Sequence, residues 1–284
     1  NAADGADLNY YLPSAAAVTL TIADSTGKTV RTLHENGKPG LNRVTWNLRY
    51  PPLTKVTLLT SPPGKDWLET PDAGRPLVVW GGPSPAEGPR ILPGAFTVSL
   101  AVGGAQAGSA KLQVLPDPNS WGGATTMRAG QALLLQISDE INQTAQLINE
   151  LETTRKQVDT LVAKLPEGRG AAAVRKAADA LSAKAAAIES RLFYFEGGGN
   201  GSEISFQGSP QLYEKLGSLY NNLQDSGRYN TGAELGPTAA QVEVNKTLAQ
   251  TLASIHQVAD AFRQKDVAAF NAVARSNGVE GIAQ

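Results

Sequence analysis

Proline and tryptophan are concentrated in the first 121 residues of this 284-residue chain. Fourteen of the 17 prolines lie between Pro13 and Pro118, and all 4 tryptophans lie at or before Trp121. From Thr126 onward, long runs of helix-forming residues carry apolar side chains at helical spacing. Because proline interrupts helices and inner strands but is frequent in turns, this change of composition predicts a β-rich domain followed by a helical one. A chain of this length can hold two domains that each bury a core.

Short segments with alternating apolar and polar residues occur throughout the N-terminal part. Residues 17–22 place Val18, Leu20 and Ile22 on one face, and turn-forming residues lead from there into residues 29–33. Further strand candidates are residues 7–12, 41–48, 76–80, 95–102 and 110–115. About seven short strands separated by Gly and Pro turns predict an Ig-like antiparallel β-sandwich over residues 1–118. Residues 51–93 are predicted to form a long loop lying over the sandwich.

Residues 124–284 carry apolar residues at intervals of three, four or seven. The run from Leu134 to Leu165 predicts one helix of about 40 residues, which Pro166 ends. Three more main helices and a short last one are predicted at residues 170–195, after Ser209-Pro210, from Pro237 to Phe262, and at residues 267–273. Four main helices with short to medium connections predict an antiparallel bundle.

The balance of charge argues against a polyanionic partner. The net charge is −1, with 25 Lys and Arg against 26 Asp and Glu, so no strong field attracts nucleic acid or an anionic membrane. No apolar run approaches the ~20 residues that span a bilayer, so no membrane insertion is expected. Residues 1–8 lack the order of a signal peptide, and the only methionine is Met127. We therefore expect a processed product or an excised piece of a longer protein.

No catalytic constellation stands out from the residue spacing. The absence of cysteine excludes disulfides, thiolate metal sites and cysteine nucleophiles. His34 and His256 are the only histidines and fall in different predicted domains, which favours neither a metal site nor a catalytic triad. The glycine-rich residues 197–201 follow a helix rather than a strand and lack the ending of a phosphate loop. The sequence predicts no cofactor, no metal and no enzymatic activity for this chain.

Trp67 and Trp80 are the candidate ligand-binding residues. Both lie in the predicted long loop, where an exposed indole could stack on a sugar ring and donate a hydrogen bond through its N–H group. Such residues can equally pin a long loop onto a sheet, and packing is the favoured interpretation. Trp46 lies in a predicted strand and is expected in the core.

Several motifs in order resemble the Ig-like domain of the flagellar hook-capping type. These are Tyr10-Tyr11-Leu12-Pro13, residues 18–24, Val30-Arg31-Thr32-Leu33, residues 40–50, Leu92-Pro93-Gly94-Ala95-Phe96-Thr97-Val98 and Val114-Leu115-Pro116-Asp117-Pro118. Phe96 stands where that family usually has Tyr. With the helical motifs Pro237-Thr238 and Phe270-Asn271-Ala272-Val273, the whole chain resembles the C-terminal region of large secreted bacterial proteins. Their N-terminal portion is a sortilin-like or Asp-box β-propeller, often labelled glycosyl hydrolase.

The resemblance implies an accessory, spacer or assembly role in an extracellular, cell-surface or periplasmic setting. The first hypothesis is a non-catalytic structural and interaction module whose partners are another protein, a second copy of itself, or the upstream β-propeller of the same polypeptide. The alternative is a carbohydrate-binding accessory module of a secreted glycoside hydrolase, with a glycan bound at Trp67 and Trp80. A third hypothesis is an enzyme whose site lies between the domains or in the propeller, none of whose residues belong to this sequence.

Overall fold

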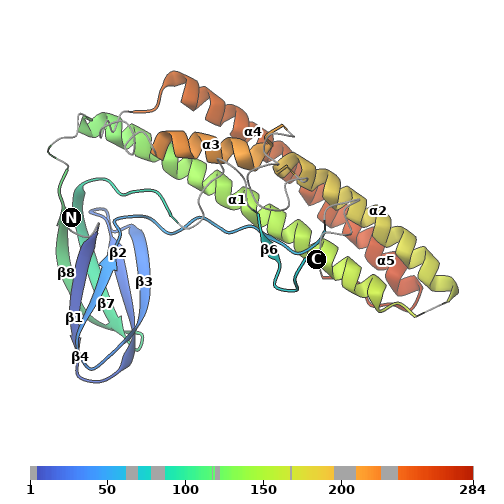
Figure 1. Ribbon diagram of the computed structural model, residues 1–284, viewed down its shortest axis with the longest axis horizontal. Coiled ribbons are helices and arrows are strands. Elements are labelled where there is room, and N and C mark those ends of the chain that lie inside the picture. Colours follow the sequence, from blue (N-terminus) through green and yellow to red (C-terminus); the bar gives the residue numbers. More distant parts are fainter. Residues whose placement is uncertain are drawn as a thin grey trace. The chain divides into compact units, whose positions relative to one another are not determined.

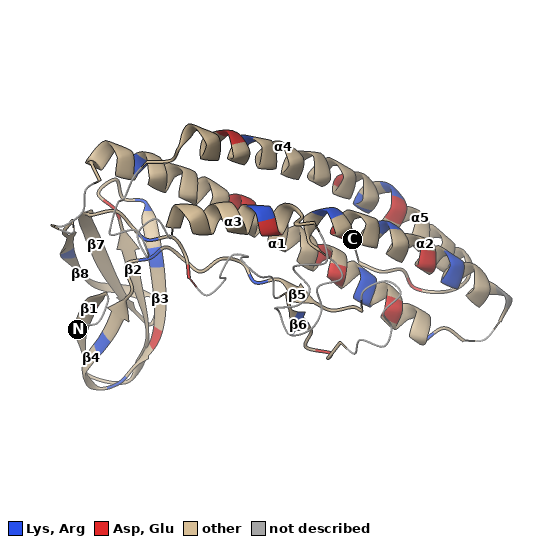
Figure 2. Cartoon of the chain, turned by 45° about the horizontal axis from the view of Figure 1, so that its top comes forward, with Lys and Arg blue, Asp and Glu red and all other residues tan. Residues whose placement is uncertain are grey.

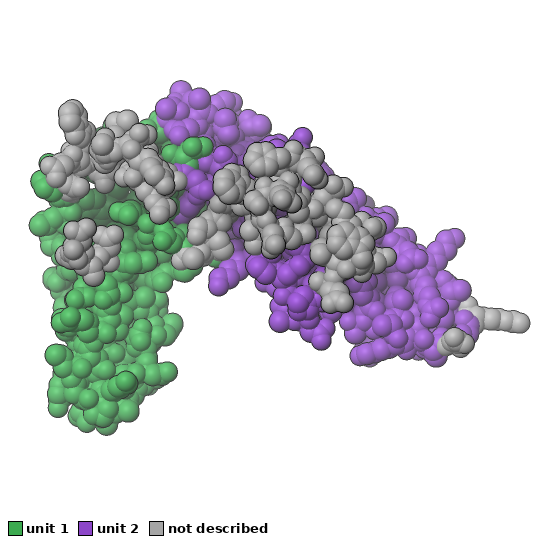
Figure 3. All heavy atoms as spheres, viewed as in Figure 1, with its two compact units in different colours: residues 1–53, 85–138, 222–237 green, residues 54–84, 139–221, 238–284 purple. Residues whose placement is uncertain are grey.

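Antiparallel sheets in the N-terminal part and helices in the C-terminal part make the chain a mixed α and β protein (Figure 1). It divides into two compact units, which Figure 3 distinguishes by colour. The sheet unit comprises residues 1–53, 85–138 and 222–237, and the helical unit comprises residues 54–84, 139–221 and 238–284. The computed structural model describes residues 5–61, 70–77, 87–116, 118, 122–166, 168–194, 209–224 and 236–283.

The sheet unit contains a four-stranded and a two-stranded antiparallel sheet. The strand order of the larger sheet is β3-β2-β7-β8, and β1 pairs with β4 in the smaller one. These strands are β1 (Ala6–Leu12), β2 (Ala16–Ala23), β3 (Thr29–Gly37), β4 (Gly40–Trp46), β7 (Gly94–Val102) and β8 (Ala105–Val114). A turn in which the Asp24 carboxylate accepts hydrogen bonds from the Thr26 and Lys28 amides joins β2 to β3.

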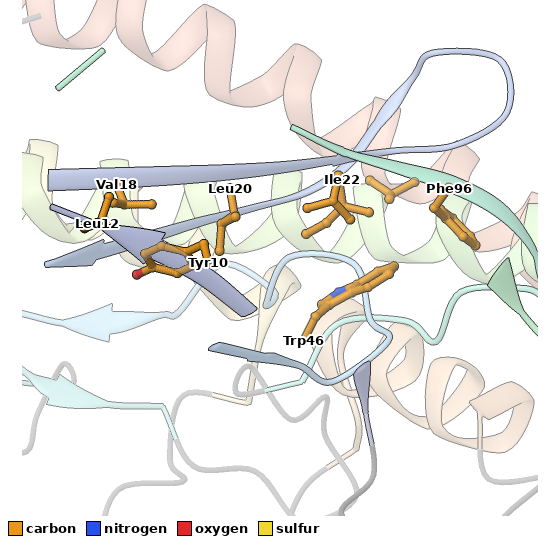
Figure 4. Close-up of a cluster of buried hydrophobic side chains, with 9 residues drawn as sticks. Tyr10, Leu12, Val18, Leu20, Ile22, Trp46 and Phe96 are labelled. Atoms are coloured by element: carbon orange, nitrogen blue, oxygen red, sulfur yellow. The ribbon is translucent and has the colours of Figure 1, made fainter. Parts of the chain in front are cut away.

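Both sheets contribute to one hydrophobic core (Figure 4). Val18, Leu20 and Ile22 of β2 are buried on one face, as their alternation with polar residues predicts. Trp46 is fully buried and meets Phe96 edge to face, with ring centroids 5.6 Å apart and an interplanar angle of 74°. The indole nitrogen of Trp46 donates to the Arg49 carbonyl at 3.0 Å, so its polar atom is satisfied inside the core. The prediction that Trp46 is a core residue is confirmed.

The predicted long loop at residues 51–93 does not lie as a whole over the sheets. Its last part returns to the sheet unit. There the Tyr50 amide donates to the Pro89 carbonyl, and the Ile91 amide donates to the Leu48 carbonyl. Residues 54–61 instead belong to the helical unit and hydrogen-bond to its first helix. Within this segment Thr57–Leu58 (β5) pairs with Arg75–Pro76 (β6). Of the predicted strand at residues 76–80, residues 78–80 lie outside the described residues. Residues 54–60 lie on the helix because its polar side chains satisfy this extended backbone.

Most of the predicted helices are present with small changes at their ends. The first helix has 40 residues, as its apolar repeat predicts. The predicted short fifth helix is not separate, because a π-helical turn continues the fourth helix directly into it. The described helices are α1 (Ala124–Ala163), α2 (Arg169–Leu192), α3 (Leu212–Gln224), α4 (Ala239–Ala261), η2 (Phe262–Val267) and α5 (Ala268–Ser276).

Side chains accept hydrogen bonds from main-chain amides at the N-termini of α3 and α4. Thr238 is the N-cap of α4 and forms a capping box with Gln241, so Pro237 stands before the cap. α3 begins at Leu212, later than Ser209-Pro210 predicts, because the Glu214 carboxylate accepts the Gln211 amide at 2.9 Å. Glu214 also accepts the Tyr194 amide at 3.0 Å, which ties the end of α2 to the start of α3.

The helical unit buries an apolar seam along its helices. In Figure 1, α2 and the continuous α4-η2-α5 helix lie along α1. Buried apolar residues of the seam include Ile141, Leu147, Ile148 and Val158 of α1, Val174, Leu181, Ile188 and Leu192 of α2, Leu216 and Tyr220 of α3, Leu252 and Ile255 of α4, Phe262 of η2 and Phe270 of α5. Figure 2 shows Lys and Arg interspersed with Asp and Glu along the helices. Within the described residues, no helix has both the length and the apolar character to cross a membrane.

Candidate functional site

An extended segment lies along one face of α1 and is held there through its backbone. This segment, residues 54–61, is named the strap. The Asn142 side chain accepts the Thr54 amide at 2.7 Å. The Asn149 side chain accepts the Thr57 amide at 2.8 Å and donates to the Lys55 carbonyl at 2.9 Å. Because residues seven apart are two helical turns apart, both asparagines share one face of α1.

Glu152 continues the same row and binds the end of the strap. Its carboxylate accepts the main-chain amide of Leu59, the amide of Thr60 at 2.8 Å, and the Thr60 hydroxyl at 3.0 Å. Glu152 is 1% exposed and Thr60 is also buried. A buried carboxylate requires several donors to replace the water it has lost, and the strap supplies three of them.

Arg155 joins Glu152 to a second buried carboxylate on α2. One terminal nitrogen of its guanidinium lies 3.1 Å from Glu152 Oε1 and 2.9 Å from Glu189 Oε2. The other terminal nitrogen donates to the Ser61 carbonyl at 2.9 Å. Glu189 is 0% exposed. Glu152, Arg155 and Glu189 are called the carboxylate cluster below.

Burial raises the pKa of Glu189 to about 8, because the interior penalises the ionised carboxylate. The Arg155 charge opposes this increase, and the Glu152 charge adds to it. Among the described atoms, Glu189 Oε1 has no hydrogen-bond partner. Near neutral pH, Glu189 is therefore mostly protonated, and the single charge of Arg155 balances that of Glu152.

The carboxylate cluster resembles an acid and base pair in composition but not in accessibility. General acid or base catalysis requires a carboxyl group within hydrogen-bonding reach of a substrate. Neither carboxyl group has appreciable exposed surface, and the oxygens of Glu152 are bonded to the strap. In this arrangement the cluster fastens the strap and α2 to α1.

A second polar pair is buried between α1 and α4. The Asn245 amide nitrogen donates to Glu140 Oε1 at 3.3 Å, and both residues are buried. The Thr144 hydroxyl donates to the Glu140 carbonyl at 2.7 Å, within α1 itself. This pair also joins two helices.

The sequence-predicted ligand site at Trp67 and Trp80 lies outside the described residues. His34 is exposed on β3, with its Nδ1 3.2 Å from the Thr19 hydroxyl. His256 is half-buried on α4, so the two histidines belong to different units. Within the described ranges, no group of three or more His, Cys, Asp or Glu side chains could hold a metal ion.

The sequence patterns considered above did not predict the carboxylate cluster, although the positions of Arg155 and Glu189 in their helices could have indicated it. Arg155 stands four residues after Leu151 and three before Val158, which is a core position of the apolar stripe. Glu189 similarly follows Ala185 by four residues and precedes Leu192 by three. Charged residues at core positions of two helices predict a buried ion pair, because an unpaired buried charge is very costly.

Comparison of the chain with protein-family models, with curated proteins and with solved structures found no match.

Proposed function

We propose that this chain is a non-catalytic structural and interaction module that acts in attachment or assembly. The observation that carries the proposal is the carboxylate cluster, a set of three buried ionisable groups in the helical unit. Its hydrogen bonds and ion pairs go to the chain's own strap and helices. Groups that are used in this way stabilise a scaffold and leave no reacting atom open to a substrate.

The proposal includes an Ig-like β-sandwich in the sheet unit. The supporting observation is one core shared by two antiparallel sheets, in which Trp46 is fully buried. The hook-capping-type motifs support the same assignment. They also support a parent protein that is secreted or exposed at the cell surface, with a β-propeller upstream.

An exposed apolar pair on the smaller sheet supports the interaction role. Tyr11 of β1 and Leu41 of β4 are cross-strand partners and are 70% and 76% exposed. On the same face, Arg43 donates to the Asn9 side chain at 3.1 Å, and Thr45 donates to Asp7 at 2.7 Å. An aromatic and aliphatic pair beside polar groups is a composition typical of protein interfaces. A protein partner or a second copy of the chain would cover this pair.

A comparison of three proteins tests the interaction role. The proteins are the wild type, the double variant Tyr11→Ser/Leu41→Ser, and the control Val258→Ser, which removes an exposed apolar side chain from α4. Sedimentation velocity over a wide concentration range, alone and with the purified upstream region of the parent, should detect association of the wild type and of the control. The double variant should associate more weakly. Equal association of all three proteins would remove Tyr11 and Leu41 from the proposal.

Activity assays test the non-catalytic role. The purified chain should not turn over glycosides, peptides or phosphate esters, with or without added Ca²⁺ and Zn²⁺. Turnover that survives repurification and disappears in Glu152→Gln or Glu189→Gln would overturn the proposal.

A further inference from the structure

The strap is bound by two chemically different sets of side chains along its length. At its start, Asn142 and Asn149 bind Thr54, Lys55 and Thr57, and these amide side chains do not titrate. The end of the strap is bound by ionisable groups, since Glu152 accepts from Leu59 and Thr60 while Arg155 donates to Ser61. A change of pH can therefore act on one end of the strap and leave the other unchanged.

We infer that the carboxylate cluster is a pH-sensitive latch, which holds strap residues 59–61 on α1 while Glu189 is protonated and loosens them when that proton is lost. The inference goes beyond an attachment role and does not depend on it. Arg155 is the connecting group, because the same guanidinium binds Glu152, Glu189 and the Ser61 carbonyl.

The charges around Glu189 explain why its proton matters. Among the described residues, Arg155 and Glu152 are the charged groups that act on its carboxyl group. Arg75 of β6 interacts with Glu152. The helices α4, η2 and α5 also pack against α2. Their ion pairs lie elsewhere, and these are Lys246 with Glu243, Lys184 with Asp266, Arg263 with Glu150, and Arg263 with Asp260. When Glu189 ionises, Arg155 must therefore pair with two buried carboxylates, and Arg75 adds a positive charge near Glu152 alone.

Loosening should be confined to the end of the strap. Val56 and Leu58 are buried, so apolar contacts and the two asparagines hold its first part at every pH. Opening at residues 59–61 admits water to Arg155 and Glu189, where the carboxylate is stable in its ionised form. Opening is thus coupled to the release of one proton.

This coupling fixes the direction and range of the effect. In the closed state the pKa of Glu189 is about 8, and access of water in the open state lowers this pKa toward the ordinary value of 4.5. The free energy that favours the closed state is therefore largest below the open-state pKa of Glu189. It decreases as the pH rises between the two pKa values, and it is constant above the closed-state pKa.

Amide hydrogen exchange in the intact chain tests the latch. Protection factors, corrected for the intrinsic pH dependence of exchange, are measured for the Leu59, Thr60, Thr54 and Thr57 amides across this range. Protection of Leu59 and Thr60 should fall with rising pH by at most roughly tenfold per pH unit, because one proton is released on opening. Thr54 and Thr57 should keep their protection. An equal loss at all four amides, or no loss at Leu59 and Thr60, would overturn the inference.

Two variants identify the titrating group. Glu189→Gln should remove the pH dependence at Leu59 and Thr60, because glutamine stays neutral while keeping an acceptor for Arg155. The matched control is Glu214→Gln, which alters another carboxyl group whose pKa burial raises but which binds Tyr194 and Gln211 instead of the strap. An unchanged pH dependence in Glu189→Gln would overturn the inference. If that variant does not fold, the comparison of the two strap ends in the wild type still decides the question.

Discussion

The side chain of Asn271 binds both main-chain groups of Ile282. Its oxygen accepts the Ile282 amide at 2.8 Å, and its nitrogen donates to the Ile282 carbonyl at 3.0 Å. Asn271 is buried on α5, and a Cβ atom at Gly281 would lie 2.4 Å from the Asn271 oxygen. Glycine therefore permits the close approach. These contacts fix residues that follow α5 against the helical unit, and the Ala283 amide donates to Gln157 of α1 at 3.1 Å.

Replacement of Asn271 by alanine should destabilise the helical unit by about 1–3 kcal/mol, because it leaves two main-chain groups without their partners. Asn277→Ala is the matched control, since Asn277 is exposed and its side-chain hydrogen bonds within the described residues go to Val273 and Ser276 of its own helix end. Urea denaturation followed by helical circular dichroism measures both free energies of unfolding. Equal effects of the two substitutions would show that the contact with Ile282 contributes little.

Replacement of Ile141 or Ile148 by aspartate should cost more than about 3 kcal/mol of stability, because each places an unpaired charge in the apolar seam. Both isoleucines are fully buried in the helical unit. Gln146→Asp, at an exposed position of α1, introduces the same charge without burial and should have little effect. Thermal melts of the three variants check this, and an unchanged melt for Ile148→Asp would indicate that this face of α1 is accessible.

The Glu189→Gln variant should make stability less dependent on pH. In the folded wild type, Glu189 keeps its proton up to a pKa of about 8, whereas the unfolded chain releases it near 4.5. The wild type is therefore stabilised below the lower value and loses this stability as the pH rises through the upper one, by at most about 1.4 kcal/mol per pH unit. Denaturant titrations across the window should show a smaller slope in Glu189→Gln. Asp139→Asn, at an exposed position of α1, should retain the wild-type slope.

Separate expression of residues 1–118 and 124–284 tests the predicted division of the chain. We expect both fragments to fold, but the helical fragment should melt at a lower temperature than the helices of the full chain. The reason is that Asn142, Asn149 and Glu152 lose the strap, which lies on the other fragment. Circular dichroism melts of the fragments and of the full chain measure the difference. An identical melting temperature would mean that the strap adds no stability, and two unfolded fragments would mean that each part needs the other.

Local patterns predicted much of the fold because burial has a characteristic period in each element. Alternation identified the buried face of β2, and apolar spacing identified α1 at its full length. Helix ends were less predictable. Glu214 supplies the hydrogen bond that sets the start of α3, and this competes with the signal of Ser209-Pro210.

The candidate site could not be predicted in the same way, because its partners are far apart in sequence. Thr60 and Glu152 are separated by 92 positions, and Arg155 and Glu189 by 34. The core spacing of Arg155 and Glu189 could have indicated an ion pair. It could not have indicated the strap, because main-chain amides of any sequence can fill that role.

The sequence by itself determined where sheets and helices form, because hydrophobic periodicity and turn residues act over a few neighbouring positions. The tertiary structure alone decided that residues 54–61 lie on α1 and that one guanidinium holds two buried carboxylates. The physical reason is that a buried polar group is costly unless the folded chain supplies it with a hydrogen-bond partner. That partner is chosen by proximity in space, which a local pattern does not encode.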